Sequence, residues 1–208
     1  KEAKSNSLMT MCAMCFNTLK RANERVRADA DALSTLNDLM YEEETKYEGD
    51  VDVYHLLEIL KDKIGFETIR QKTVKPLQDL KVASYYGCYL IRPREIGIDD
   101  PENPQILEDL TASLGATPID FPYKTECCAA YKTVDNPNIV AERTYQILNS
   151  ARQLGAEVVV VSCPLCAFNL DARQKETSKL YPEFQHVPIL YFTQLMALAL
   201  GCSEEKLR

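Results

Sequence analysis

The sequence is short of histidine, of positive charge and of long apolar runs. It has only two histidines in 208 residues, so it offers no His-rich metal site. Its formal net charge of −7 argues against non-specific binding to nucleic acid or to anionic membranes. No run of about 18 apolar residues occurs, and the start lacks a charged segment followed by an apolar one. The sequence therefore predicts neither a transmembrane helix nor a secretory signal.

Cysteine, by contrast, is plentiful, with eight residues. Without a secretory signal the expected location is the cytoplasm, where thiols stay reduced. Clustered cysteines in that compartment indicate metal ligands or redox groups rather than structural disulfides. From Cys88 onward they follow the pattern C-x38-C-C-x34-C-x2-C. This spacing delivers thiols from several separate segments of the chain.

Strand and helix patterns alternate along the chain. Helices are expected over residues 16–47, 53–64, 103–114, 138–154, after Cys166, and as a buried apolar helix over 187–201; strands are expected over 81–86, 117–121 and 157–162. Alternation of this kind predicts an α/β fold with a mostly parallel sheet flanked by helices. Several cysteines come directly after predicted strands, at the carboxyl ends where open α/β sheets usually bind ligands.

A short internal repeat relates the start of the chain to its second half. MTMCAMCFNTL (9–19) superposes on VVSCPLCAFNL (160–170), with Cys12 on Cys163 and Cys15 on Cys166. Each copy is predicted to be a strand end, a C-x-x-C turn and a helix. We therefore expect two pseudo-repeated domains, an incomplete one over 1–75 and a complete one over 76–208. The chain begins at Lys1 rather than at Met, which indicates a fragment, a processed form or an incomplete chain, and from the repeat we expect a first unit with its own cysteines upstream.

The thiols from Cys88 onward indicate a metal cluster. The five candidate ligands are Cys88, Cys127, Cys128, Cys163 and Cys166. Soft thiolates select iron–sulfur clusters, zinc or Cu(I), and five of them exceed the four ligands of a tetrahedral zinc site. A C-x-x-C turn at a helix start also stabilises negative sulfur through the helix dipole. A structural zinc module and a thioredoxin-like redox pair remain as alternatives, and Cys202 is expected in the core.

Other polar residues receive weaker predictions. His55 and His186 are expected to be structural, although His55 is a weak candidate for a proton donor lining a substrate pocket. Arg92 and Arg94 are expected to be solvated or ion-paired, and the alternative is that they hold an anionic group of a substrate. The tyrosines around Cys88 are expected to pack.

Five segments that span nearly the whole chain carry a family resemblance: TMCAMCFNTLKRAN (10–23), YYGCYLIRP (85–93), TECCAA (125–130), SCPLCAFNLD (162–171) and VPILYFTQLMALALG (187–201). They resemble the heterodisulfide reductase B subunits and the wider group of cysteine-rich CCG-domain proteins. Ala129 stands where that family usually has glycine after the cysteine pair, and a difference of one methyl group is expected to leave the thiolates in place.

The resemblance implies an oxidoreductase subunit that acts on sulfur groups. It implies a noncubane [4Fe–4S] cluster on the five cysteines and a second, partial site at Cys12 and Cys15. A disulfide of the CoM-S-S-CoB type, as in methanogenesis, would be reduced to two thiols. The implied partners are a flavin-containing reductase subunit and a ferredoxin-like iron–sulfur subunit. Some relatives are instead electron-transfer subunits of glycolate, lactate, succinate or quinone-linked systems, which is the alternative function.

Overall fold

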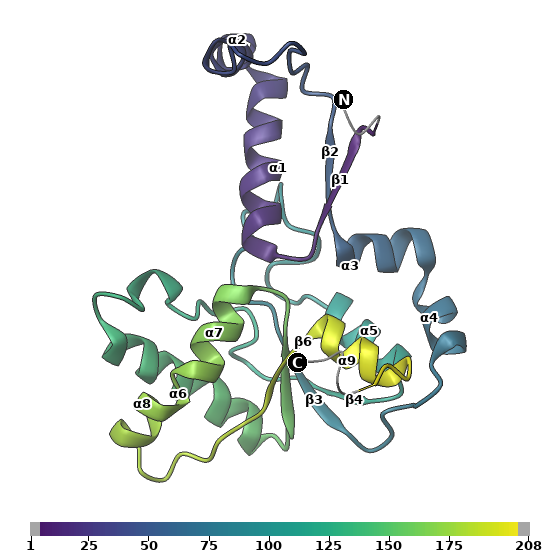
Figure 1. Cartoon of the computed structure of the whole chain (residues 1–208). Coiled ribbons are helices and arrows are strands. Elements are labelled where there is room, and N and C mark those ends of the chain that lie inside the picture. Colours follow the sequence, from purple (N-terminus) through teal and green to yellow (C-terminus); the bar gives the residue numbers. More distant parts are fainter. Residues whose placement is uncertain (1–4, 204–208) are drawn as a thin grey trace.

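The computed structural model describes residues 5–203 and contains two parallel sheets (Figure 1). In the smaller sheet, β1 (Ser7–Thr10) pairs with β2 (Asp52–His55). The larger sheet has the strand order β4-β3-β5-β6. Its strands are β3 (Lys81–Tyr85), β4 (Thr117–Ile119), β5 (Val158–Val161) and β6 (Ile189–Tyr191). The predicted α/β class with parallel sheets flanked by helices is confirmed.

Helices cover both faces of the larger sheet. In Figure 1, α6 (Pro137–Gln153), α7 (Pro164–Ala172) and α8 (Gln174–Leu180) lie on one side, and α5 (Ile106–Ser113) and α9 (Phe192–Ala199) lie on the other. All four valines of β5 are therefore buried. Burial of such a side chain contributes roughly 1.5–3 kcal/mol, so this strand anchors the core. These elements agree with the predicted ones to within a few residues, with two exceptions. The start of α9 is later than expected, and the single helix expected after Cys166 is a pair, of which α7 begins earlier, at Pro164.

The single helix expected over 16–47 is wrong. The chain forms α1 (Ala13–Ala28) and α2 (Ala30–Leu39), and they are separated at Asp29. Asp29 takes an extended conformation and its carboxylate accepts hydrogen bonds from the amides of Asp31 and Ala32. An aspartate that caps a helix in this way starts a new helix and so interrupts the old one. In Figure 1, α1 runs beside the β1–β2 pair and both project away from the larger sheet.

The helix expected over 53–64 is wrong at its start, because residues 53–55 form the end of β2. The helical part follows as α3 (Leu56–Glu58) and a π-helical turn (Ile59–Ile64), and then α4 (Phe66–Lys72). His55 marks the switch: its ring accepts a hydrogen bond from the amide of Leu57, and its own amide donates to the Glu58 carboxylate at 2.7 Å. This is a helix-start pattern that apolar periodicity alone does not reveal.

The helix expected over 187–201 is wrong at its start for the same reason. Residues 189–191 form β6 beside β5, and α9 begins only at Phe192. The amide of Tyr191 donates to the Gln194 side chain at 2.8 Å, which again places the helix start after a strand end. A short apolar run fits a buried strand or a buried helix equally well, so the pairing partner decides.

The predicted boundary near residue 75 remains a prediction, and its outer limits lie beyond the described residues. Leu57, Leu60 and Ile69 pack into the main core around the larger sheet, whereas Phe16, Val53 and Ile96 form a small separate core. The segment that follows β2 is thus attached to the second unit. Within residues 5–203, no helix combines the length and apolar character needed to cross a bilayer.

Candidate functional site

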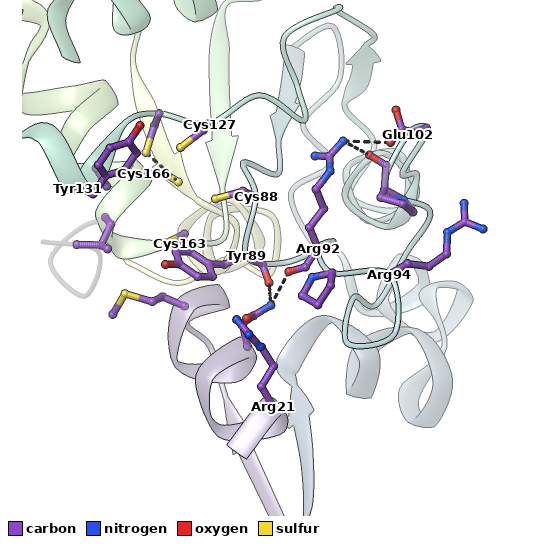
Figure 2. Close-up of a pocket in the computed structure, with 17 residues that line it drawn as sticks. Arg21, Cys88, Tyr89, Arg92, Arg94, Glu102, Cys127, Tyr131, Cys163 and Cys166 are labelled. Carbon is purple, nitrogen blue, oxygen red and sulfur yellow. Dashed lines mark hydrogen bonds and ion pairs between the residues drawn. The ribbon is translucent and has the colours of Figure 1, made fainter. Parts of the chain in front are cut away.

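The larger sheet has a cavity of about 850 Å³ at the carboxyl ends of its central strands (Figure 2). The thiols of five cysteines contribute to its lining: Cys88, Cys127, Cys128, Cys163 and Cys166. Cys88 follows β3, the adjacent pair lies between β4 and α6, and the C-x-x-C pair follows β5 at the start of α7. The chain leaves β3 for β4 on one side and continues to β5 on the other, which makes this edge the switch point where open sheets bind ligands.

The thiols surround the cavity rather than a single point. The sulfurs of Cys128 and Cys166 lie 3.5 Å apart, and both residues are buried together with Cys163. Among residues 5–203, no three His, Cys, Asp or Glu side chains converge closely enough to hold one metal ion. Five thiols spread around a cavity of this size suit a group as large as a multi-iron cluster, for which thiolates are the usual ligands.

The loop that carries the adjacent cysteines is fastened by its carbonyl groups. Each carbonyl from Lys124 to Cys128 accepts a hydrogen bond from another element. The amides of Tyr86 and Gly87 donate to the carbonyl of Lys124, the Arg92 guanidinium to that of Thr125 and the Tyr85 hydroxyl to that of Glu126. The Arg143 guanidinium donates to the carbonyl of Cys127 and the Asn169 side-chain amide to that of Cys128, and all these distances are 2.6–3.3 Å. The loop also supplies a hydrogen-bond donor to sulfur, because the Ala129 N–H donates to Cys127 Sγ at 3.3 Å. Such donors stabilise a negatively charged sulfur.

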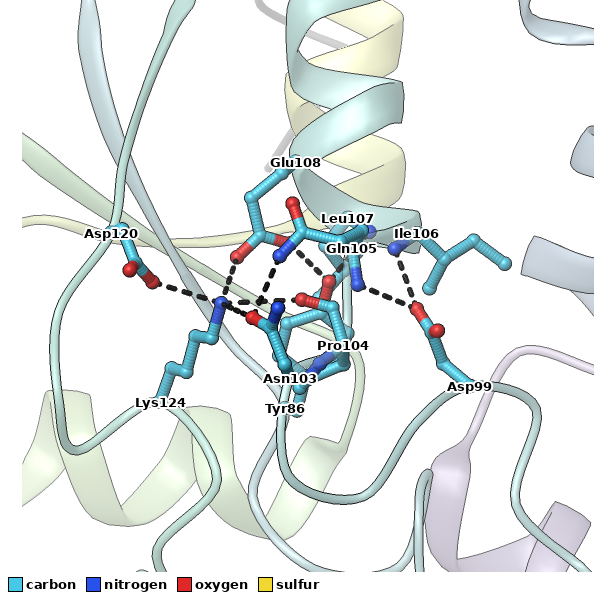
Figure 3. A network of polar contacts seen from close by, with 10 residues as sticks. All are labelled: Tyr86, Asp99, Asn103, Pro104, Gln105, Ile106, Leu107, Glu108, Asp120 and Lys124. Carbon is cyan, nitrogen blue, oxygen red and sulfur yellow. Dashed lines mark hydrogen bonds and ion pairs between the residues drawn. The ribbon is translucent and has the colours of Figure 1, made fainter.

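A buried ion pair lies behind this loop (Figure 3). Lys124 Nζ contacts Asp120 Oδ1 at 2.8 Å and Glu108 Oε1 at 3.3 Å, and Glu108 also accepts a hydrogen bond from the Tyr86 hydroxyl. Tyr86 lies two residues before Cys88, and Lys124 lies three before Cys127. Because a buried pair must overcome the cost of desolvation, its main effect is to fix geometry. Here it holds the two cysteine-bearing segments against each other.

Several thiols are set to ionise. A hydrogen bond from the Cys88 thiol lowers the pKa of Cys127 to about 6, with help from the Ala129 amide. A hydrogen bond from Cys166 likewise lowers the pKa of Cys163 to about 6 and lowers that of Cys128. The donors Cys88 and Cys166 have raised pKa values for the same reason. The site thus favours several thiolates, the form of cysteine that binds metals.

Ala129 has a left-handed conformation, with φ of 57° and ψ of 34°. Such a conformation costs a residue with a β-carbon roughly 1–2 kcal/mol, and glycine avoids that cost. The structure therefore explains why the family favours glycine after the cysteine pair. The alanine in this chain adopts the same conformation at the cost of local strain, and that the thiols keep their places remains a prediction.

One wall of the cavity comes from α1, a contribution that was not expected from the sequence. Met14, Asn17 and Arg21 share one face of the helix and all line the cavity. The Asn17 side-chain amide donates to the carbonyls of Tyr89 (2.8 Å) and Arg92 (2.7 Å), which attaches α1 to the turn after Cys88. The helical spacing of these residues after the first C-x-x-C motif was the available signal.

Three arginines line the cavity (Figure 2). Arg92 contacts Glu102 at 3.2 Å and Arg94 lies 3.9 Å from Asp100, so both are ion-paired, as expected. Arg92 also fastens the cysteine loop and is therefore occupied. Arg21 has no ion pair to another residue of the described chain, and it is exposed at the wall formed by α1.

The remaining predicted residues lie outside the cavity lining. Cys12 and Cys15 start α1, where the Cys15 amide donates to Cys12 Sγ at 3.3 Å and burial raises the pKa of Cys12 to about 11. His55 is fully buried, and burial lowers its pKa to about 4, so it is neutral at pH 7. The structure gives it no place beside the cavity as a proton donor. The prediction that Cys202 lies in the core is wrong: it follows Gly201 beyond the end of α9 and is exposed.

Comparison with known proteins agrees with this site. Residues 82–171 match the CCG cysteine-rich domain family. The chain is 32% identical over 201 residues to the 8-methylmenaquinol:fumarate reductase membrane anchor subunit of Wolinella succinogenes, which covers 96% of this chain and 69% of that protein. It is 30% identical over 209 residues to the B subunit of the ferredoxin/F420H2-dependent CoB-CoM heterodisulfide reductase of Methanosarcina acetivorans, over 99% of this chain and 69% of that protein.

A crystal structure of a hypothetical protein from Helicobacter pylori shares the fold, with a TM-score of 0.64 and 12% sequence identity over 89% of this chain and 33% of that one. Fold and thiols together define a cysteine-rich α/β protein with an iron–sulfur redox role. The chain belongs to the CCG-domain family, and relatives at about 30% identity within it are heterodisulfide reductase B subunits.

Proposed function

We propose that the chain holds a noncubane [4Fe–4S] cluster through Cys88, Cys127, Cys128, Cys163 and Cys166 and reduces a small-molecule disulfide at that site. The observation that supports the proposal is that all five thiols line one open cavity of about 850 Å³. The cavity extends past the cysteines to Arg21, Arg94 and Tyr131, so it offers space for a small organic molecule beside the cluster. A cluster that only passed electrons onward would need no such space.

The overall reaction consumes two electrons and two protons and converts one disulfide into two thiols. The cluster, when bound, supplies electrons one at a time. The chain contributes the surroundings. The fastened loop fixes the positions of Cys127 and Cys128, and its amides stabilise negative sulfur. Met14 and Leu165 line the cavity as apolar side chains, and Arg21 presents a cation at its edge. The site therefore suits a disulfide that carries an anionic group.

An assay with an artificial one-electron donor tests this function in the iron-loaded protein. Anionic and neutral disulfides are supplied, and thiol release is measured. We expect turnover, and we expect Arg21→Gln to raise KM for the anionic disulfide with little effect on the neutral one. Arg70→Gln is the matched control, because Arg70 lies on exposed α4 beside Glu67. Absence of thiol release from every disulfide, in a protein whose cluster is reduced and reoxidised, contradicts the proposal.

The Wolinella relative supports a second candidate. The name of that protein couples a quinol to fumarate reduction, and its identity to this chain equals that of the methanogen proteins to within a few per cent. In this alternative the chain transfers electrons between partner subunits and has no substrate of its own. Cluster turnover with quinol-derived electrons but without thiol release favours this function. The cytoplasmic location and the flavin and ferredoxin-like partners remain predictions from the family resemblance.

We also propose that an upstream segment completes the first unit. The pair β1–β2 has the parallel arrangement of β5–β6, and β3 lies on the far side of β5. A strand equivalent to β3 would therefore pair with the far edge of β1, and its own cysteines would join Cys12 and Cys15. The full reading frame decides this. A frame without a further Cys-Cys pair, in this chain or a partner chain, contradicts the two-domain arrangement.

A further inference from the structure

The two C-x-x-C segments share more of their structure than the short sequence repeat indicates. Cys12 and Cys163 each occupy the position just before a helix, and each follows a strand. The neighbouring strands have matching registers: His55 lies opposite Thr10 at the end of β1, and Tyr191 lies opposite Val161 at the end of β5. Thr10 and Val161 each precede their cysteine by two residues. His55 and Tyr191 are therefore equivalent positions of the two units.

Tyr191 joins the two segments directly. Its hydroxyl donates to the carbonyl of Ser162 at 2.6 Å and to the carbonyl of Met11, so that one hydrogen is shared between them. Ser162 and Met11 are themselves equivalent, because each immediately precedes the first cysteine of its motif. The amide of Ala13 adds a second link by donating to the same Ser162 carbonyl at 3.1 Å. The residues joined by Tyr191 come from opposite ends of the chain.

The equivalent residue of the first unit does not repeat this link. The ring of His55 packs against Phe16 and Phe192, with centroids 5.8 and 5.9 Å away, and its Nδ1 accepts from the amide of Leu57. The carbonyls of Met11 and Ser162 lie near this ring and raise the pKa of His55 slightly against the lowering by burial. Its Nε2 nevertheless has no hydrogen-bond partner of ordinary geometry among the described residues. The hydroxyl of Tyr191 thus joins the two equivalent carbonyls, whereas His55 does not, and the amides of Ala13 and Met14 add links to the Ser162 carbonyl and the Cys163 thiol.

We propose that Tyr191 is a positioning residue that locks the two C-x-x-C segments together and transmits changes at one to the other. The proposal takes these cysteines as cluster ligands and in that respect rests on the proposed function. The connection runs from Cys12 through the carbonyl of Met11, the tyrosine hydroxyl and the carbonyl of Ser162 to Cys163. Hydrogen bonds near a cluster are among the features that set its redox properties, so a shift of either carbonyl alters the other site.

The first experiment measures amide hydrogen exchange in the metal-free protein. Tyr191→Phe keeps the ring and removes the shared hydroxyl. We expect the Ala13 amide and its neighbours before α1 to exchange about fivefold faster, the factor that corresponds to a hydrogen bond of typical strength. The matched control is Tyr145→Phe, which removes a hydroxyl that donates to Glu183 at 3.0 Å far from both motifs. If these amides exchange at the parent rate in Tyr191→Phe, the proposal that Tyr191 holds the two C-x-x-C segments together is wrong.

The second experiment measures transmission in the iron-loaded protein by the EPR spectrum of the cluster at the five cysteines. Cys12→Ser is introduced alone and together with Tyr191→Phe. We expect a spectral change from Cys12→Ser in the parent and a clearly smaller one in the Tyr191→Phe background, where only the links from the amides of Ala13 and Met14 remain. Equal changes in both backgrounds, or none in the parent, overturn the transmission. Failure to reduce any disulfide would defeat the proposed function without altering either result.

Discussion

Ala129 allows a quantitative test of the backbone strain behind the adjacent cysteines. The change Ala129→Gly removes a strain of roughly 1–2 kcal/mol, because glycine adopts the left-handed conformation freely. It also gives the unfolded chain more freedom, which costs about 0.4–1 kcal/mol, and it removes a buried methyl group worth about 0.8 kcal/mol. The terms nearly cancel, so this variant alone decides little.

Ala130→Gly supplies the matched control. Ala130 is the next residue, it begins the short 3-10 helix over Ala130–Lys132, and it is not among the residues with positive φ. The loss of chain freedom applies there in full and the loss of methyl burial only in part, because Ala130 is half-buried, so we expect a loss of about 0.5–1.5 kcal/mol without any relief of strain. The difference between the two variants is the conformational term less this small difference in burial. Ala129→Gly should be more stable than Ala130→Gly by about 0.5–1.5 kcal/mol.

The assay is urea unfolding of the metal-free protein under anaerobic, reducing conditions, followed by circular dichroism. Midpoints are converted to free energies of unfolding with the measured dependence on urea. Equal stability of the two variants would refute the argument, because it would mean that the loop carries no strain at Ala129. A lower stability of Ala129→Gly would refute it more strongly.

Three further predictions concern the thiols and their support. Cys127→Ser should lower iron and acid-labile sulfide per chain, whereas Cys202→Ser, at an exposed position, should leave both unchanged; equal iron in the two variants contradicts the ligand assignment. In the metal-free protein Cys127 has a lowered pKa of about 6, so its thiolate is present above that pH and is lost as the pH falls below it. Its alkylation rate should therefore level off near pH 7, where an ordinary thiol with a pKa near 8.5 is still gaining reactivity. A rate that keeps rising past pH 8 contradicts the lowered pKa. Lys124→Met leaves a buried carboxylate unpaired and should cost about 3 kcal/mol, whereas Lys132→Met, in an exposed pair, should cost less than about 1 kcal/mol; similar losses in thermal or urea unfolding would show that the buried pair is not a strong constraint.

The secondary structure that was predictable was local. The four valines of β5 predicted a strand buried on both faces, and the helical pattern before Gly155 predicted α6. Two failures fall where a strand passes directly into a helix, at His55 and at Tyr191, and a third falls at Asp29, where a helix cap divides one predicted helix into two. An apolar run of that kind satisfies either periodicity, and only pairing with β1 or β5 selects the strand.

Residue type and spacing alone predicted which thiols meet at the site. The spacing of the cysteines after predicted strands placed five thiols at one sheet edge, because the carboxyl ends of parallel strands share an edge. The structure brings those thiols to one cavity. The proposal that they are ligands rests on the chemistry of sulfur, which is a property of the residue and does not depend on the fold.

Tertiary structure decided how those thiols are held. Three features join residues that are far apart in the sequence: the cavity wall from α1, the hydrogen bonds to the carbonyls from Lys124 to Cys128, and the hydrogen bonds of the Tyr191 hydroxyl. Arg92 shows the difference: the sequence predicted a solvated or ion-paired side chain, but it gave no sign that the same guanidinium holds the carbonyl of Thr125. Residue type and local spacing carry propensity and chemistry, but the distance between remote segments is set only when the whole core packs.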